Sequence, residues 1–487
     1  MCVRWSRGSV KLDATTCSEG KDCLMAIDFN ASIFRQYDVR GLADEELACP
    51  FVEALGRAFG TMVRRAGGAR VAVGRDCRES GPRLVTAFSR GVRAAGVDVV
   101  DVGVGPTPLL YFALHHCAVD GGAAITGSHN PPAWNGFKLC LGKNSIHSEA
   151  IQTLRELIET EDFESGAGGE TTLDLTGAYH AWLLADITPP RRRLKVVVDA
   201  GNGTGGPPAV ALYGALGVEV IPLYCEPDPR FPNHHPDPTV EANLADLKAA
   251  VTEHGADFGV AFDGDADRIG VVDHLGRVVW GDQLLLFFGQ ELLRHHPGAR
   301  IIGEVKCSRV LFDGLRAAGG RPEMWKVGHS LIKARMKETG APLAGEMSGH
   351  IFFADRFFGF DDAVYAGARL IELVGRGETR LADLVDTLPM TQITPELRVA
   401  CSDAHKFAVV ARAADHFRGR YPVIEVDGLR IEFPAGWGLV RPSNTQPVLV
   451  MRFEADDLEG LTAYRREVEE WLQQHAPEVD FSADTHT

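Results

Sequence analysis

The chain has 487 residues, of which 45% are hydrophobic and 24% are charged, so it is long enough for about three or four globular domains. Its formal net charge of -16 and the absence of a basic stripe argue against nucleic acid as a general partner, and no apolar run reaches the roughly 20 residues that span a bilayer. The ten cysteines occur singly, without CxxC pairs, which indicates reduced thiols and a cytoplasmic protein.

Residues 1–24 differ in composition from the rest of the chain. Four cations alternate there with small polar residues, and the apolar stretch of a signal peptide is missing. We expect either a disordered extension or a chain that naturally starts at Met25.

The first periodic segments predict an α/β unit. Residues 47–65 place apolar side chains at the three- to four-residue spacing of a helix. A short apolar strand (70–73), a polar turn (74–80), a second helix (82–95) and a second strand (96–104) follow. This strand, loop, helix and strand order is typical of layered α/β proteins.

The same unit recurs twice. In the second copy, residues 194–199 form the strand, 200–206 a glycine-rich loop, 208–216 the helix and 217–223 the returning strand. In the third copy, residues 299–305, 309–318 and 320–327 take the places of the first strand, the helix and the returning strand. A recurrence of this kind predicts three tandem domains of one architecture.

The chain changes character at about Thr391. Shorter predicted strands (424–426, 430–433 and 448–454) precede a closing amphipathic helix over 458–473. We therefore predict the α/β class, with three tandem repeated α/β domains and a C-terminal α+β domain. The predicted bounds are 25–174, 175–277, 278–389 and 390–487.

In each repeat a further apolar strand is followed by a polar loop. These are the Ser128 loop, T-G-S-H-N-P at 126–131, the aspartate loop, D-G-D-A-D-R at 263–268, and the Glu346 loop, G-E-M-S-G-H at 345–350. Loops at equivalent strand ends of α/β units are where ligands bind. Repeats packed side by side would therefore bring the three loops together.

Ser128 is presented on a turn. An apolar strand signal at 122–125 precedes it, and Pro131 and Pro132 prevent that strand from continuing. Gly127 has no side chain to block a ligand beside the hydroxyl. Taken alone, the motif also fits an ordinary strand-ending turn.

Asp263, Asp265 and Asp267 occupy alternate positions, so their carboxylates can point to one side and offer Mg²⁺ a site of hard oxygens. A solvated acidic turn is the alternative. A calcium loop fits poorly, because Arg268 and His274 stand where it needs glycine and glutamate. Arg268, beside the carboxylates, can clamp a phosphate oxygen.

A serine on a turn together with a carboxylate-bound Mg²⁺ indicates phosphoryl transfer, in which Ser128 would be the covalent carrier. Lys138 lies close enough in sequence to reach the same pocket. No His-Asp pair at a recognisable spacing suggests an acyl-transfer triad instead.

Two further segments suit a phosphosugar. Glu346, Ser348 and His350 alternate with small residues, as hydrogen bonding to adjacent sugar hydroxyls requires. Residues 436–447 predict a serine-rich turn whose phosphate cradle for a non-reacting group consists of Arg441, Ser443, Asn444 and Thr445. His329 and Ser330, at the end of the third repeat, are further candidates for the pocket.

Together these motifs resemble the α-D-phosphohexomutase family, and within it the bacterial phosphomannomutase/phosphoglucomutase enzymes. The resemblance runs from about Phe34 to Phe453, with T-G-S-H-N-P, D-G-D-A-D-R, G-E-M-S-G-H and R-P-S-N-T in the family's order. It implies four domains around a central cleft and reversible interconversion of hexose 1-phosphate and hexose 6-phosphate, with mannose or glucose as the sugar. It also implies a hexose 1,6-bisphosphate that is both the intermediate and the primer.

The resemblance assigns roles residue by residue. Ser128 is expected to be the phosphoserine and to bind Mg²⁺ together with Asp263, Asp265 and Asp267. The residues expected to bind substrate are Tyr37, Arg268, Lys306, Ser330, Glu346, Ser348, Arg441, Ser443, Asn444 and Thr445. The residues expected to act in catalysis beside Ser128 are Arg40, Lys138, His329 and His350, of which Lys138 and His350 are the candidates for proton transfer.

Three alternatives stay open. A phosphoglucosamine mutase is the nearest, although its third loop is expected to carry Gln where this chain has Met347. A metal-dependent phosphatase would release phosphate instead of isomerising the sugar. A non-catalytic phosphosugar- or Ca²⁺-binding protein would not need Ser128. The mutase hypothesis predicts a phosphosugar substrate and a monomer without membrane or nucleic acid partners.

Overall fold

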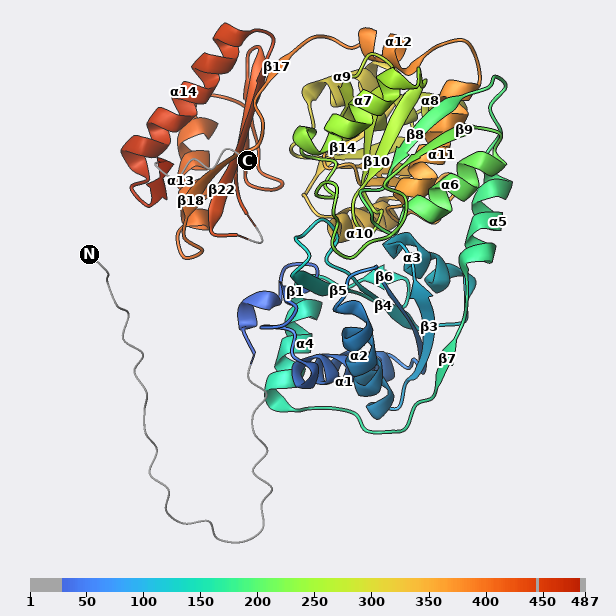
Figure 1. The fold of residues 1–487 in the computed structure, drawn as a ribbon. Helices are drawn as coiled ribbons and strands as arrows, with labels where there is room; N and C mark the ends of the chain where they lie inside the picture. The colour runs from blue at the N-terminus through green and yellow to red at the C-terminus, as the bar shows by residue number, and fades with distance from the viewer. Residues whose placement is uncertain (1–28, 444–445, 482–487) are drawn as a thin grey trace, which may run out of the picture.

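The structure is a computed structural model that describes residues 29–443 and 446–481 (Figure 1). The expected N-terminal extension, Met25, and two residues of the phosphate cradle, Asn444 and Thr445, lie outside this part of the chain. Within it, the strands form four sheets. No helix of the described residues is both long and apolar enough to cross a membrane.

The first domain contains a mixed sheet with helices packed on it. Its elements are η1 (Ala31–Ile33), β1 (Val39–Leu42), α1 (Cys49–Arg65), β2 (Arg70–Arg75), α2 (Gly81–Ala94), β3 (Asp98–Val104), α3 (Thr107–His116), β4 (Gly121–Ile125), β5 (Trp134–Leu141), β6 (Asn144–Ser145), α4 (Glu149–Thr160) and β7 (Glu170–Thr172). The strand order is β1-β5-β4-β2-β3-β7, with β6 paired to β5.

The second domain has the strand order β12-β11-β10-β8-β9. Its elements are α5 (Thr176–Asp186), β8 (Lys195–Asp199), α6 (Gly206–Ala215), β9 (Glu219–Leu223), η2 (Glu241–Leu244), α7 (Ala245–Glu253), β10 (Phe258–Phe262), β11 (Ile269–Asp273) and β12 (Val278–Val279). All five residues of β10 are buried, as are those of β4, which is typical of strands covered by helices on both faces.

The third domain has the strand order β14-β13-β15-β16. Its elements are α8 (Gly281–His295), β13 (Arg300–Glu304), α9 (Arg309–Ala317), β14 (Arg321–Trp325), α10 (His329–Thr339), β15 (Leu343–Gly345), β16 (Ile351–Phe353), α11 (Ala363–Gly375) and α12 (Leu381–Asp386). One buried apolar cluster extends from α3 of the first domain through the second and third domains.

The three sheets share one arrangement, which confirms the predicted repeat. The corresponding strand orders are β3-β2-β4-β5, β9-β8-β10-β11 and β14-β13-β15-β16, each with three parallel strands and an antiparallel fourth. The helix of each repeat is followed by a glycine with φ near that of a left-handed turn, namely Gly96 (84°), Gly217 (83°) and Gly319 (82°). The predicted helices and strands of the repeats end within two residues of the observed ones.

The fourth domain has its own sheet and core, and Figure 1 shows it in red beside the third domain. Its elements are β17 (Gln392–Ile393), β18 (Leu397–Cys401), α13 (Lys406–Arg418), β19 (Val423–Ile424), β20 (Leu429–Phe433), β21 (Gly436–Pro442), β22 (Val448–Ala455), α14 (Leu458–His475) and β23 (Val479–Asp480). The strand order is β19-β20-β21-β22-β18-β23, all antiparallel, with β17 paired to β22.

The prediction of a turn over 436–447 was wrong for its first half. Residues 436–442 form β21, a fully buried strand paired with β20 and β22. Its glycines allow close packing between strands, since a Cβ on Gly438 would lie 2.8 Å from the Phe453 ring. Arg441 is therefore on a strand, and the loop begins only after Pro442.

Candidate active site

Ser128 lies in the loop after β4, and its backbone is left-handed (φ 48°), which is uncommon for a residue other than glycine. Its amide donates to Thr126 Oγ1 over 2.8 Å. The Ser128 hydroxyl donates to Asp263 Oδ2 over 2.6 Å, and His129 Nδ1 lies 3.2 Å from the same hydroxyl oxygen. The Ser128 loop and the aspartate loop are therefore in direct contact.

The three aspartates are fully buried, and one oxygen of each lies within 4.8 Å of the others. Asp263 Oδ1 accepts from the amides of Asp267 (3.1 Å) and Arg268 (3.2 Å). Asp265 Oδ1 and Asp267 Oδ1 have no hydrogen-bond partner among the described residues. Because a buried oxygen without a partner is costly, these carboxylates fit a hard cation that would satisfy both atoms.

Lys138 balances part of this negative charge. Its ammonium donates to Asp265 Oδ2 over 2.7 Å and to Asp267 Oδ2, and Thr107 Oγ1 also donates to Asp265 Oδ2, over 2.5 Å. Burial, with repulsion from Asp265 and Asp267, raises the pKa of Asp263 well above its ordinary value. Burial also acts to raise the pKa of Asp265, but the attraction and hydrogen bond of Lys138, the hydrogen bond of Thr107 and the attraction of Arg40 together outweigh it, and the pKa is lowered. A bound cation would let all three carboxylates ionise together.

The Glu346 loop is tied to the start of α10. Glu346 Oε1 accepts from the amide of Gly328 over 2.6 Å, and Oε2 accepts from Ser348 Oγ over 3.2 Å. Ser330 Oγ is buried in the first turn of α10 and has no hydrogen-bond partner in the described part of the chain. These three side chains can offer acceptors and donors to neighbouring hydroxyl groups.

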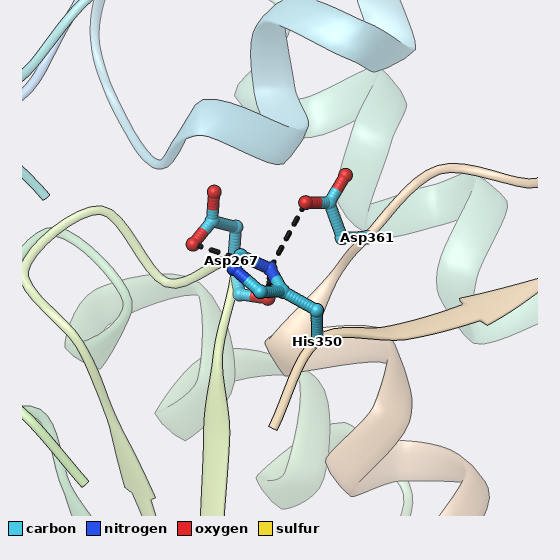
Figure 2. A group of neighbouring side chains, drawn as sticks. All are labelled: Asp267, His350 and Asp361. Atoms are coloured by element: carbon cyan, nitrogen blue, oxygen red, sulfur yellow. Dashed lines mark hydrogen bonds and ion pairs between the residues drawn. The ribbon is translucent and has the colours of Figure 1, made fainter. Parts of the chain in front are cut away.

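His350 lies between Asp267 and Asp361, as Figure 2 shows. Its Nδ1 lies 3.0 Å from Asp361 Oδ2 and 3.1 Å from the carbonyl oxygen of Asp267. Arg268 Nε donates to His350 Nε2 over 3.0 Å. Since an arginine N–H can only donate, Nε2 is the acceptor and the ring proton is on Nδ1. His350 thus joins the Glu346 loop to the aspartate loop.

Rings connect the first domain to the third. The rings of Tyr37 and His329 meet edge to face with centroids 5.3 Å apart, and His329 stacks on His350 at 5.5 Å. Burial lowers the pKa of His329 well below its ordinary value, so the ring is neutral near pH 7. Arg40, on β1, donates to the carbonyl oxygen of Gly127 over 3.1 Å and so reaches the Ser128 loop.

Arg441, a described residue of the predicted phosphate cradle, lies where the third and fourth domains meet. Arg441 donates through Nε and Nη2 to Asp427 Oδ2, over 3.2 and 3.1 Å. The same oxygen accepts from the amide of Val327 over 3.0 Å, just before α10. Lys306 Nζ pairs with Glu396 Oε2 at 3.1 Å. Both cations therefore pair with carboxylates of the fourth domain.

Most of the predicted site residues within the described ranges form one contact group. It joins three domains and contains Tyr37, Arg40, Ser128, Lys138, Asp263, Asp265, Asp267, Arg268, His329, Glu346, Ser348 and His350. Four other predicted residues are not part of these contacts. Lys306 and Arg441 pair with Glu396 and Asp427, the hydroxyl of the buried Ser443 accepts from the Gln446 amide over 3.2 Å, and Ser330 Oγ has no hydrogen-bond partner among the described residues.

Several residues in contact with the site were not predicted, namely Asp76, Arg78, Thr107, Asp361 and Asp427. Asp76 and Arg78 follow β2, the strand next to β4, and this position at a strand end of the repeat was the available signal. Thr107 begins a helix after a proline, which by itself indicates only a helix start. For Asp361 and Asp427 we find no local sequence signal.

Four family models match the chain in succession. They describe the α/β/α domains I, II and III and the C-terminal domain of phosphoglucomutase/phosphomannomutase, and they match residues 31–165, 183–276, 280–391 and 396–470. The chain belongs to the phosphoglucomutase/phosphomannomutase family. It is accordingly an enzyme of the isomerase class, built from three α/β domains and a C-terminal domain.

Individual members of the phosphoglucomutase/phosphomannomutase family are similar over most of their length. A phosphomannomutase/phosphoglucomutase of Pseudomonas aeruginosa is 48% identical over 432 residues, which are 88% of this chain and 93% of that protein. A phosphoglucomutase of Neisseria gonorrhoeae is 45% identical over 429 residues, or 87% of this chain and 93% of that one. A solved structure of a family protein from Burkholderia thailandensis has a TM-score of 0.88 at 46% identity, and the match covers 93% of this chain and 99% of that chain.

Proposed function

We propose that this enzyme interconverts hexose 1-phosphate and hexose 6-phosphate through a phosphorylated Ser128 and a bound hexose 1,6-bisphosphate. The observation that carries the proposal is the 2.6 Å hydrogen bond between the Ser128 hydroxyl and Asp263, in a group of buried carboxylates of which two oxygens have no hydrogen-bond partner among the described residues. A serine in this setting suits a covalent phosphate carrier.

Glucose and mannose phosphates are the proposed substrates. The relatives that are 45 to 48% identical carry the names phosphoglucomutase and phosphomannomutase. Met347 also stands where a phosphoglucosamine mutase is expected to have Gln. Solved N-acetylglucosamine-phosphate mutases are only 14 to 16% identical, so they support the fold alone, and this alternative is not favoured.

Each half of the proposed reaction moves one phosphoryl group. In the first half, a free hydroxyl oxygen of the hexose phosphate forms a bond to the phosphorus on Ser128, the bond from Ser128 Oγ to phosphorus breaks, and the hydroxyl proton passes through a protein group to Oγ. The bisphosphate then turns around, and Ser128 takes the other phosphoryl group by the reverse step. His350 and Lys138, both in contact with Asp267, are the proposed groups for proton transfer.

The residues that fit Mg²⁺ are Asp263, Asp265 and Asp267, with an oxygen on Ser128 as a further ligand. When bound, Mg²⁺ would supply positive charge to stabilise the negative charge that develops on the transferred group. Arg268, whose Nε contacts His350, adds a fixed cation beside the same place.

The remaining site residues are proposed to hold the sugar in either orientation. Arg441, Ser443, Asn444 and Thr445 would bind the non-reacting phosphate together with Lys306. Glu346 and Ser348 would bind hydroxyl groups of the ring, with Tyr37, Arg40, His329 and Ser330 around them. Because the bisphosphate has to reverse its orientation between the two half-reactions, these residues must bind the sugar in both orientations.

We also propose domain bounds of 25–174, 175–277, 278–389 and 390–487. The first two divisions fall between consecutive family-model matches, and the third falls two residues before the end of the third match at residue 391.

The proposed function is tested by coupled assays of glucose 1-phosphate and mannose 1-phosphate isomerisation, with Mg²⁺ and glucose 1,6-bisphosphate as primer. We expect turnover by the wild type, loss of activity on chelation with recovery when Mg²⁺ is restored, and no turnover by Ser128→Ala. Release of inorganic phosphate without isomerisation would instead identify a phosphatase. Glucosamine 6-phosphate as the preferred substrate would overturn the assignment of the sugar.

A further inference from the structure

A buried ion pair lies directly against the Ser128 loop and has no part in the chemistry proposed above. The side chains of Arg78 and Asp76 are 0% and 1% exposed, and Arg78 Nε donates to Asp76 Oδ2 over 3.1 Å. Removing two charges from water costs more than their attraction returns unless additional hydrogen bonds satisfy the remaining atoms. The additional hydrogen bonds of Arg78 and Asp76 are made with the Ser128 loop and the residues that follow it.

The terminal nitrogens of Arg78 donate to four backbone carbonyl oxygens between Ser128 and Trp134, the first residue of β5. Nη2 donates to Ser128 over 2.7 Å and to Asn130 over 2.6 Å. Nη1 donates to Pro131 over 2.7 Å and to Trp134 over 2.9 Å. Because the guanidinium is planar and rigid, it fixes these four carbonyl groups relative to one another.

Asp76 holds the beginning of the same loop. Its Oδ2 accepts from Thr126 Oγ1 over 2.7 Å and from the amide of Gly127 over 3.2 Å. Thr126 Oγ1 in turn accepts from the Ser128 amide over 2.8 Å. The backbone of Ser128 is therefore held on both sides, at its amide through Thr126 and at its carbonyl by Arg78.

Close packing supports the same arrangement. A Cβ on Gly127 would lie 2.4 Å from Arg78 Cζ, and a Cβ on Gly264 would lie 2.6 Å from the Ser128 carbonyl oxygen. Ser128 itself has a φ of 48°, a conformation that such a residue keeps only where the surroundings impose it. The bonds with Arg78 and Thr126 hold the carbonyl and the amide of this residue in that conformation.

From this geometry we propose that Arg78 and Asp76 are positioning residues for Ser128. They act through the backbone of residues 126–134, direct the Ser128 oxygen toward Asp263, and keep it there while it alternates between hydroxyl and phosphate ester. The inference rests on the proposed function of Ser128 as the phosphate carrier. It adds the group that holds the carrier in place.

The test is the rate at which Ser128 takes up phosphate. Dephosphorylated enzyme would be mixed with glucose 1,6-bisphosphate and Mg²⁺, and phosphate on the Ser128 peptide would be followed by mass spectrometry in a single turnover. Arg78→Lys keeps the charge but loses the planar fork, so we expect uptake to slow by about 10- to 100-fold. Affinity for glucose 6-phosphate, bound in part by the proposed phosphate cradle of the fourth domain, should change far less.

A second variant keeps the test valid if Arg78→Lys does not fold. Thr126→Val retains the volume of the side chain but removes the hydroxyl that links Asp76 to the Ser128 amide. It should slow uptake by roughly 10-fold. A role in stability alone would lower the melting temperature and the folded fraction without changing the uptake rate of the folded molecules.

Arg83→Lys is the matched control. Arg83 also donates to backbone carbonyl oxygens in the first domain, those of Ala43 (2.5 Å) and Leu47 (2.9 Å), but to none of the Ser128 loop in the described structure. The Arg83→Lys variant should be less stable than the wild type but should take up phosphate on Ser128 at the wild-type rate. Wild-type uptake by both Arg78→Lys and Thr126→Val, or by the one that folds, overturns the proposal. If the wild type itself takes no phosphate on Ser128, the proposed function fails, and the positioning role with it.

Discussion

Single residues in the site carry charges that are buried and only partly paired. Lys138 satisfies one oxygen of Asp265 and one of Asp267, which leaves the other oxygen of each without a hydrogen-bond partner among the described residues. An incompletely satisfied polar group in a protein interior costs free energy that the fold must supply elsewhere. Such a cost is expected at a binding site whose ligand, when bound, pairs with the unsatisfied oxygens.

Glu304 gives a pH-dependent prediction at this scale. It is fully buried at the end of β13 and accepts from the amides of Lys306 (2.6 Å) and Met347 (3.3 Å). Burial raises the pKa of Glu304 to about 7, above the ordinary 4.5. The folded state then binds a proton that the unfolded state has released, so this group stabilises the fold below its ordinary pKa and loses that contribution as the pH rises toward 7.

Glu304→Gln removes this proton binding. We expect the wild type to lose up to about 3 kcal/mol of unfolding free energy relative to the variant between about pH 4.5 and pH 7.5. Urea unfolding of both proteins across this range measures the difference, with the exposed Glu159→Gln as the control. A gap between wild type and variant that stays constant with pH would contradict the raised pKa.

Residues with a local motif could be proposed as site residues from the sequence, and residues that contact the site only through the fold could not. Ser128 and the three aspartates stand in short segments whose composition and spacing already indicate phosphate and metal chemistry. Arg78 is 50 residues from Ser128 in sequence, and only the pairing of β2 with β4 brings the two together. The residues around Arg78 in the sequence have the composition of an ordinary polar turn.

Among the helices and strands, most elements of the three repeats were predicted from the spacing of apolar residues, which differs between helices and buried strands. The prediction of a turn where β21 lies was wrong for a physical reason. Gly436, Gly438 and Pro442 are typical of a turn, but a Cβ on Gly436 would lie 2.1 Å from the Glu454 carbonyl oxygen of the neighbouring strand. Glycine is needed at this position because the neighbouring strand lies too close for a side chain, and this closeness is known only once the strands are paired in the sheet.

Another glycine sets where the Glu346 loop lies. Gly281 is the first residue of α8, and a Cβ there would be 2.3 Å from the Glu346 carbonyl oxygen and 2.8 Å from that of Met347. We expect Gly281→Ala to displace the loop, with a destabilisation of about 1–3 kcal/mol and a KM for the phosphosugar raised roughly tenfold. Thermal unfolding and steady-state kinetics measure the two effects.

Gly214→Ala is the matched control for this prediction. Gly214 lies within α6, and a Cβ there would meet no atom within 4 Å. The variant should keep the wild-type KM and gain about 0.5–1 kcal/mol of stability from better helix propensity. If Gly281→Ala behaves like Gly214→Ala, α8 does not fix the position of the loop.

For the whole molecule, the position of Arg441, a residue of the proposed phosphate cradle, depends on how the fourth domain attaches to the third. Arg430 is 1% exposed, donates to the carbonyl oxygens of Val305 (2.7 Å) and Cys307 (2.8 Å), and lies 3.8 Å from the Trp437 ring centroid. Arg452 donates to the Lys306 carbonyl over 2.7 Å. These bonds join β20 and β22 to the segment that follows β13.

Arg430→Ala should therefore loosen the fourth domain. Two buried carbonyl groups would lose their donor, at a cost of about 3 kcal/mol, and the domain with its own core is expected to melt before the other three. KM for the phosphosugar should rise more than kcat falls, because the cradle is displaced from the reacting groups. Calorimetry and steady-state kinetics test both effects.

The control for this variant is Arg418→Ala, which removes a more exposed arginine of the same domain that pairs with Glu425 and Asp415. Surface ion pairs contribute little to stability, so its unfolding and kinetics should match the wild type. A single unfolding transition and an unchanged KM in Arg430→Ala would show that other contacts hold the domain.

In the proposed reaction Ser128 carries the phosphoryl group that reaches the sugar. To test this, the enzyme is labelled with glucose 1,6-bisphosphate that contains radioactive phosphate, the label is located by peptide mass spectrometry, and unlabelled glucose 1-phosphate is then added. We expect label on the Ser128 peptide alone, its transfer to hexose phosphate during the chase, and no labelling of Ser128→Ala. Isomerisation by a protein that is labelled on another residue, or not labelled at all, would show that Ser128 is not the carrier.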